Sequence, residues 1–136
     1  MRLLWWAMFV VALSGCGAKP ASQPVDPRGG GVGAKMDPRL VAEANRQLDQ
    51  AVVSTDKYLR ANALEVLRQV RGPAAFAAFR DAASDSDAVV RHAACRAIGE
   101  LRIEEGRGLA IARLSDQDRR VRLAAIFVLH RLGDTR

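Results

Sequence analysis

The sequence has few residues of the types that build catalytic and metal sites. Its 136 residues include two cysteines and two histidines. His92 lies three residues before Cys95, but two ligands do not make a metal site, and His130 stands alone. No glycine-rich phosphate loop follows a strand pattern. We therefore identify no catalytic constellation, and we predict a non-enzymatic protein without a metal or cofactor.

Aromatic residues are also scarce, at 5%, while alanine is abundant. Small side chains suit close helix packing better than a sheet, which favours β-branched and aromatic residues. The formal net charge is +6, but residues 37–136 mix 17 basic with 14 acidic side chains. This mixed-sign composition lacks the basic stripe of a nucleic-acid-binding surface, so we expect no nucleic-acid partner.

The N-terminus has the three parts of an export signal. Arg2 supplies a positive charge, residues 3–13 form an uninterrupted apolar run, and the small residues Ser14 and Gly15 follow. Eleven apolar residues are too few for a stable transmembrane helix, which needs ~20. We therefore predict that residues 1–15 are a signal peptide.

The four residues LSGC at 13–16 resemble the lipobox of bacterial lipoproteins. The resemblance implies that the signal is cleaved before Cys16 and that Cys16 carries acyl chains that bind the membrane. Gly17 is not the aspartate that retains lipoproteins in the inner membrane, so the resemblance implies the outer membrane where a cell has two. The alternative is that Cys16 is an ordinary residue after a normal signal peptide or in an anchor helix.

Residues 17–36 contain three prolines and five glycines and have no apolar period. This composition is typical of a flexible linker. We therefore divide the chain into the signal peptide at 1–15, a lipidated N-terminus and linker at 16–36, and a folded domain at 37–136.

The folded domain repeats itself every 31 residues. Segments 59–70, 90–101 and 121–132 align without gaps, and each has the apolar spacing of one helical face. An aspartate precedes each segment at the N-cap position. Preceding helices are expected at about 38–53, 73–83 and 105–114. The aligned charged residues are Asp56, Asp87 and Asp118, together with Arg60, Arg91 and Arg122.

This aspartate, arginine and alanine pattern resembles the short bacterial HEAT repeat, also called the phycobilisome-lyase-like repeat. The resemblance implies an all-α fold, an α-solenoid of about three antiparallel helix pairs. It also implies that the aligned Asp/Arg pairs form a structural ladder between neighbouring repeats. The alternative is that the three arginines form an anion-binding row. The first repeat departs most from the pattern, with Asn62 where the others have alanine.

A second apolar stripe on the last helix is a candidate partner patch. It comprises Leu123, Ile126, Phe127 and His130. Terminal repeats normally carry a polar outer face, so an exposed stripe here indicates a partner or self-association. The alternative is that Leu123 and Ile126 pack on the neighbouring helix and only Phe127 is exposed. Cys95 occupies an apolar position and is expected to be a buried core residue.

Together these features predict a lipid-anchored protein-protein interaction scaffold of the bacterial envelope. The partner is an unidentified protein or a second copy of the chain. The alternatives are an accessory or maturation factor for an envelope enzyme and a purely structural envelope protein. Besides the patch, the expected binding surface comprises Glu65, Gln69, Arg96, Glu100 and Arg131.

Overall fold

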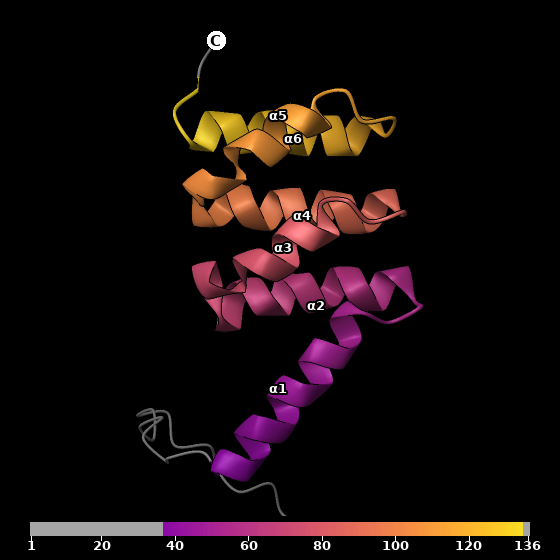
Figure 1. Cartoon of the computed structure of the whole chain (residues 1–136), viewed down its shortest axis with the longest axis vertical. Helices are drawn as coiled ribbons and strands as arrows, with labels where there is room; N and C mark the ends of the chain where they lie inside the picture. The colour runs from indigo at the N-terminus through magenta and orange to yellow at the C-terminus, as the bar shows by residue number, and fades with distance from the viewer. Residues whose placement is uncertain (1–36, 135–136) are drawn as a thin grey trace, which may run out of the picture. The chain divides into compact units, whose positions relative to one another are not determined.

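The computed structural model describes residues 37–134, which form six α-helices and two short 3₁₀ helices (Figure 1). In chain order these are α1 (Pro38–Val52), α2 (Lys57–Val70), η1 (Gly72–Ala75), α3 (Phe76–Ala82), α4 (Ala88–Leu101), η2 (Glu104–Gly106), α5 (Arg107–Arg113) and α6 (Arg119–Arg131). No strand occurs in this range. The predicted all-α architecture of three helix pairs is confirmed.

Helices α1, α2, α4 and α6 each begin at an aspartate N-cap. In α2, α4 and α6 the caps are Asp56, Asp87 and Asp118. Each of these carboxylates accepts a hydrogen bond from the backbone N–H two residues later, over 2.7–2.9 Å. This bond satisfies a helix donor that has no partner within the helix, and the negative charge favours the positive helix end. The predicted N-caps are therefore confirmed.

The second helix of every pair stacks on the second helix of the next pair. Helices α2, α4 and α6 run in the same direction, and α3 and α5 return antiparallel to them (Figure 1). The expected single helices at 73–83 and 105–114 are wrong in detail, because each is a 3₁₀ turn followed by a seven-residue α-helix. Gly106 shows one reason: a Cβ there would lie 2.3 Å from Cγ2 of Ile98, so η2 passes too close to α4 for a side chain.

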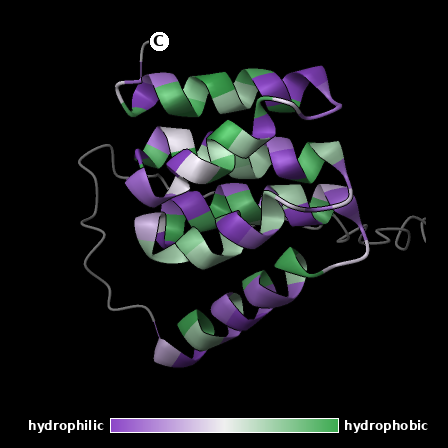
Figure 2. Ribbon diagram, turned by 45° about the horizontal axis from the view of Figure 1, so that its top comes forward, coloured by the Kyte–Doolittle hydropathy of each residue, from purple (hydrophilic) through white to green (hydrophobic). Residues whose placement is uncertain are grey.

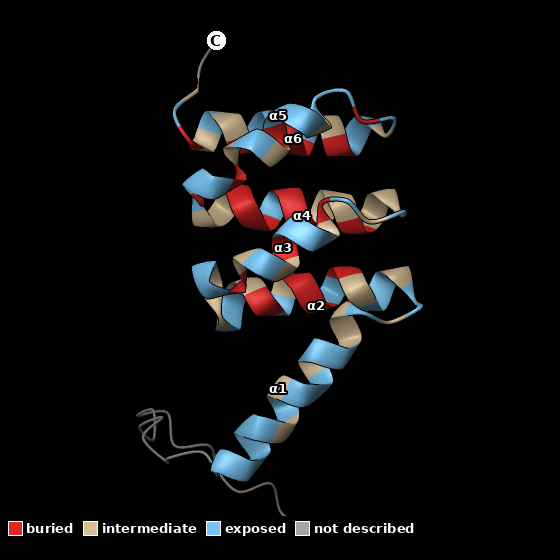
Figure 3. Ribbon diagram, in the orientation of Figure 1, coloured by how far each residue is buried: buried red, intermediate tan, exposed pale blue. Residues whose placement is uncertain are grey.

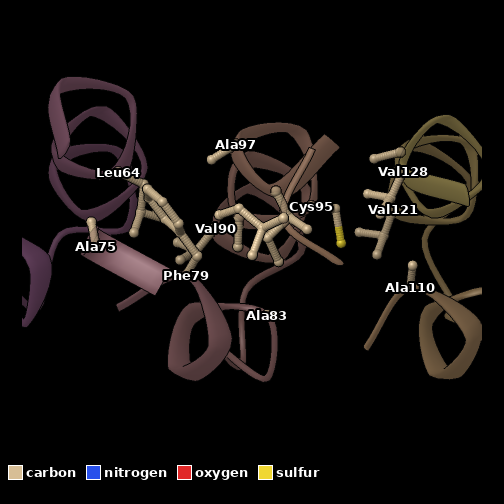
Figure 4. Close-up of a cluster of buried hydrophobic side chains, with 14 of the residues drawn as sticks. Leu64, Ala75, Phe79, Ala83, Val90, Cys95, Ala97, Ala110, Val121 and Val128 are labelled. Carbon is tan, nitrogen blue, oxygen red and sulfur yellow. The ribbon is translucent and has the colours of Figure 1, made fainter. Parts of the chain in front are cut away.

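The core lies between the stacked second helices and the shorter first helices (Figures 3 and 4). Phe79 of α3 is fully buried and lies between α2 and α4, near Leu64 and Val90 (Figure 4). The next layer joins α4 to α6, where Cys95 points toward Val121. Burial of apolar surface at each of these layers is the main force that holds the repeats together.

Helix α1 is less integrated than the other helices. It contains no buried residue and appears pale blue and tan along its whole length in Figure 3. Its half-buried Leu48 and Val52 pack against the core. Arg71, the C-cap residue of α2, adds hydrogen bonds from its guanidinium to Asp49 Oδ1 at 2.6 Å and Asn45 Oδ1 at 3.0 Å. An apolar groove therefore remains between α1 and α2. The predicted signal peptide, Cys16 and linker lie outside the described residues.

Candidate functional site

A repeated arginine geometry joins each helix pair to the next. Arg60 of α2 donates from Nε and Nη2 to both carboxylate oxygens of Asp85, each at 2.9 Å. Its Nη1 donates to the backbone carbonyls of Ser54 and Thr55, at 2.8 and 3.1 Å. One guanidinium thus holds its own loop and the loop of the next repeat. Such two-point contacts are the strong, geometrically specific form of the arginine–carboxylate pair.

Arg91 repeats this geometry one unit later. It donates to both carboxylate oxygens of Asp116 at 2.8 Å, and its Nη1 donates to the carbonyls of Asp85 and Ser86. The side chain of Asp116 is only 3% exposed. The hydrogen bond from Arg91 is the main reason why the pKa of Asp116 falls from 3.8 to about 2, against the opposing effect of burial. Asp116 is therefore ionised at neutral pH.

Arg122 occupies the third position and forms only half of these contacts. Its Nη1 donates to the carbonyls of Asp116 and Gln117, at 2.8 and 3.0 Å. Among residues 37–134, no carboxylate pairs with Arg122. The carboxylate that the geometry requires would belong to a fourth repeat. In the part of the chain that the structure describes, the ladder therefore ends at Arg122.

The carboxylates of this ladder differ from those expected. The aspartates four residues before each arginine, Asp56, Asp87 and Asp118, cap their own helices and do not pair with Arg60, Arg91 or Arg122. The paired carboxylates lie two residues before the caps of α4 and α6, in the loop that faces the preceding repeat. Asp87 alone among the three caps also reaches the preceding repeat, through an ion pair of 3.0 Å with Lys57.

The sequence carried a signal for the true partners. Asp85 and Asp116 recur at the 31-residue period. Aspartate is also common in turns, and in the structure each accepts the backbone hydrogen bond of a turn from the cap residue. In the first repeat Ser54 takes this position and makes the same turn bond to Asp56. This replacement hid the repeat of the acidic position.

The candidate patch lies on the open end of the array, on α6. Leu123 and Ile126 are exposed, so the arrangement in which they pack on a neighbouring helix is not adopted. Phe127 lies against α4, where a Cβ on Gly99 would come within 2.7 Å of the Phe127 ring. His130 is exposed beside them. Apolar segments alternate with polar ones along this last helix in Figure 2.

The expected polar binding surface is held together by ion pairs. Arg68 contacts Glu65 within α2 and reaches Glu100 of α4 at 2.9 Å. Arg96 also pairs with Glu100, at 2.6 Å. The hydrogen bond from Arg68 lowers the pKa of Glu65 to about 2. This surface is therefore a linked network across two repeats, whereas the patch on α6 is apolar.

The side chains that could act in catalysis or bind a metal do not lie together in one site. Cys95 is buried, and loss of water around it raises the pKa of its thiol to about 11, so it remains a thiol at neutral pH. Burial also disfavours the charged form of His92, which for an imidazole means that its pKa is lowered. Within residues 37–134 no cluster of His, Cys, Asp or Glu could hold a metal ion. None of the helices in this range is long and apolar enough to cross a membrane.

Comparison with known proteins agrees with the geometry. A family model described as HEAT repeats matches residues 45–130, which is more than half of the sequence. The match includes the ladder and all but the last residue of α6. No curated protein matches the sequence.

Proposed function

The chain belongs to the HEAT-repeat family, and on that premise we propose that it is a lipid-anchored, non-enzymatic scaffold that binds protein in the bacterial envelope. HEAT repeats generally mediate protein-protein interaction. The proposed anchor is Cys16, in the sequence LSGC after the apolar run at 3–13. One acyl chain gives marginal membrane binding and two hold firmly, so a diacylated Cys16 would keep the domain at the membrane.

The observation that carries the binding role is the exposed apolar end of α6. Ile126 is 53% exposed, although its counterparts one and two repeats earlier, Cys95 and Leu64, are at most 1% exposed. Solenoids normally cover this end with a polar capping repeat. An uncovered apolar face of this kind marks a protein interaction site.

The anchor and the binding face have complementary roles. An anchor limits the search to proteins at the same membrane, which raises the effective concentration of a partner there. The linker of twenty residues would span roughly 25 Å, at about 5–6 Å times the square root of its length. That reach is enough to present α6 above the lipid headgroups.

The anchor is tested by growing cells with labelled palmitate. We expect label in the wild-type chain and none in Cys16→Ala. Label that persists in Cys16→Ala would refute lipidation at this residue, and absence of label from both chains would refute the anchor.

The binding role is tested by chemical cross-linking in isolated membranes, followed by mass spectrometry of the adducts. Ile126→Glu should abolish the adduct. The matched control is Ile111→Glu on α5, because Ile111 is also 53% exposed and its counterpart Arg80 is exposed inside the array. An adduct that survives Ile126→Glu, or that both variants abolish, would contradict binding through α6.

A further inference from the structure

The exposed face of α6 is the face that the other second helices bury against the next repeat. We define the tail face as Arg119, Arg122, Leu123, Ile126 and His130. In α2 and α4 the counterparts of Ile126 lie in the core between repeats. The tail face is therefore one half of a repeat-to-repeat interface.

The other half lies at the opposite end of the array. We define the head groove as the apolar groove of about 760 Å³ between α1 and α2. Its α2 wall comprises Leu59, Asn62, Ala63, Val66 and Val70. Val66 is 44% exposed, whereas its counterparts Ala97 and Val128 are 2% and 1% exposed because the preceding repeat covers them.

The internal contacts predict which polar residues would meet if a tail face entered a head groove. Lys57 of α2 pairs with Asp87 of α4 at 3.0 Å. Two repeats after Lys57 the equivalent residue is Arg119, on the tail face. One repeat before Asp87 the equivalent residue is Asp56, beside the head groove. The opposite charges are thus retained at the junction between two copies.

A second internal pair also has a counterpart. Arg68 contacts Glu100 at 2.9 Å, and the corresponding residues at the junction are His130 and Gln69. An imidazole and an amide can share a hydrogen bond. The apolar residues agree as well, because Leu123 and Ile126 would face Leu59 and Val66.

The ladder arginine is a second contact that the junction weakens, after the replacement of the Arg68–Glu100 ion pair by His130 and Gln69. The partner of Arg122 would be Ser54, which offers a hydroxyl where the internal ladder has the carboxylate of Asp85 or Asp116. A neutral hydrogen bond is weaker than a charge-assisted pair. The junction should therefore be reversible, in contrast to the permanent interface between repeats of one chain.

We propose that the partner of the tail face is a second copy of this chain, whose head groove takes α6 in the place of a preceding repeat. This inference rests on the proposed binding role of α6. The two surfaces differ, so the contact is head-to-tail, and repeated contacts of this kind form open chains of molecules.

Two one-sided variants test the direction of the contact. Ile126→Glu blocks the tail face and Val66→Glu blocks the head groove. Full-length copies with two different affinity tags are mixed in detergent with micelles in large excess, and co-purification is measured.

Wild-type copies should co-purify, and each variant should fail to bind itself. A mixture of the two variants should bind, because one intact tail face still meets one intact head groove. Ile111→Glu and Val53→Glu are matched exposed controls that should behave as wild type.

Failure of wild-type copies to co-purify would overturn the proposal, and so would a mixture that does not recover binding. In either case, an Ile126-dependent adduct to a different protein in membranes would leave the proposed scaffold function intact. The two failures are therefore distinguishable.

A gain of affinity provides an independent test. Ser54→Asp supplies the missing carboxylate, and at this position aspartate keeps the turn bond that Asp85 and Asp116 make. We expect the dissociation constant to fall about tenfold or more, in line with a charge-assisted hydrogen bond. Adding Arg122→Ala should remove the gain. An unchanged dissociation constant, or a gain that survives Arg122→Ala, would contradict the proposed junction.

Discussion

Replacing Asp116 with asparagine removes the carboxylate at the most buried point of the ladder while keeping its shape. In the wild type this carboxylate accepts two hydrogen bonds of 2.8 Å from Arg91 and one of 3.0 Å from the backbone of Asp118. Arg113 Nη1 lies 3.5 Å away. The amide has one acceptor oxygen in place of two, and it leaves the Arg91 charge in a half-buried site without the carboxylate that it pairs with.

The loss of stability caused by Asp116→Asn can be estimated in two ways. Lowering the pKa of Asp116 from 3.8 to about 2 corresponds to about 2 kcal/mol at 1.36 kcal/mol per pH unit. Removing one partner of a buried ion pair costs about 3–5 kcal/mol. The partial exposure of Arg91 argues for the lower part of this range. We therefore expect Asp116→Asn to lower the free energy of unfolding by about 2–3 kcal/mol, which is roughly 10–20 °C in Tm for a domain of this size.

The assay is thermal and urea unfolding followed by circular dichroism at the helix band. Asp81→Asn is the matched control, because Asp81 pairs with Arg80 on the surface and its side chain is 71% exposed. Such surface pairs contribute about 0–1 kcal/mol. The reasoning is refuted if Asp116→Asn lowers Tm by less than about 3 °C, or if Asp81→Asn costs as much.

Three further predictions concern the same packing. Because the pKa of Asp116 is lower in the folded state than its ordinary value, its contribution to the free energy of unfolding is complete above about pH 4 and should be lost as pH falls toward 2. Between these pH values the stability of Asp116→Asn should therefore depend less on pH than that of wild type. Cys95 should resist thiol reagents in the folded protein and react once urea unfolds it, since burial raises its pKa to about 11; fast reaction of folded protein would contradict the burial. Gly99→Ala should lower the free energy of unfolding by about 1–3 kcal/mol, because the new Cβ would come within 2.7 Å of the Phe127 ring. Gly108→Ala has open space at its Cβ and should raise the free energy of unfolding by up to about 1 kcal/mol. Equal effects of the two variants on Tm would refute the close contact at Gly99.

The repeat pattern predicted the second helices well because their signals are local. An aspartate cap marks each start, and the apolar spacing marks the buried face, so α4 begins directly after Asp87 as expected. The breaks in the first helices were harder to predict. They depend on how closely η2 approaches Ile98, which is a property of packing between segments.

The partners in the ladder could not be assigned from spacing alone. Arg60 has two candidate aspartates in the loop of the next repeat, and only the folded loops show that Asp85 pairs with Arg60 while Asp87 caps α4. The head groove was also unpredicted. It lies between α1, which buries none of its residues, and the exposed Val66 and Val70 of α2, so it depends on how the two helices pack.

The central claim, that the array acts by binding protein through the end of α6, is tested most directly by photo-cross-linking in membranes. A photoreactive phenylalanine analogue replaces Phe127 beside the tail face, and the same analogue at Ile111 on α5 is the control. The account predicts a light-dependent protein adduct from position 127 and none from position 111. No adduct from position 127, or equal adducts from both positions, would contradict it.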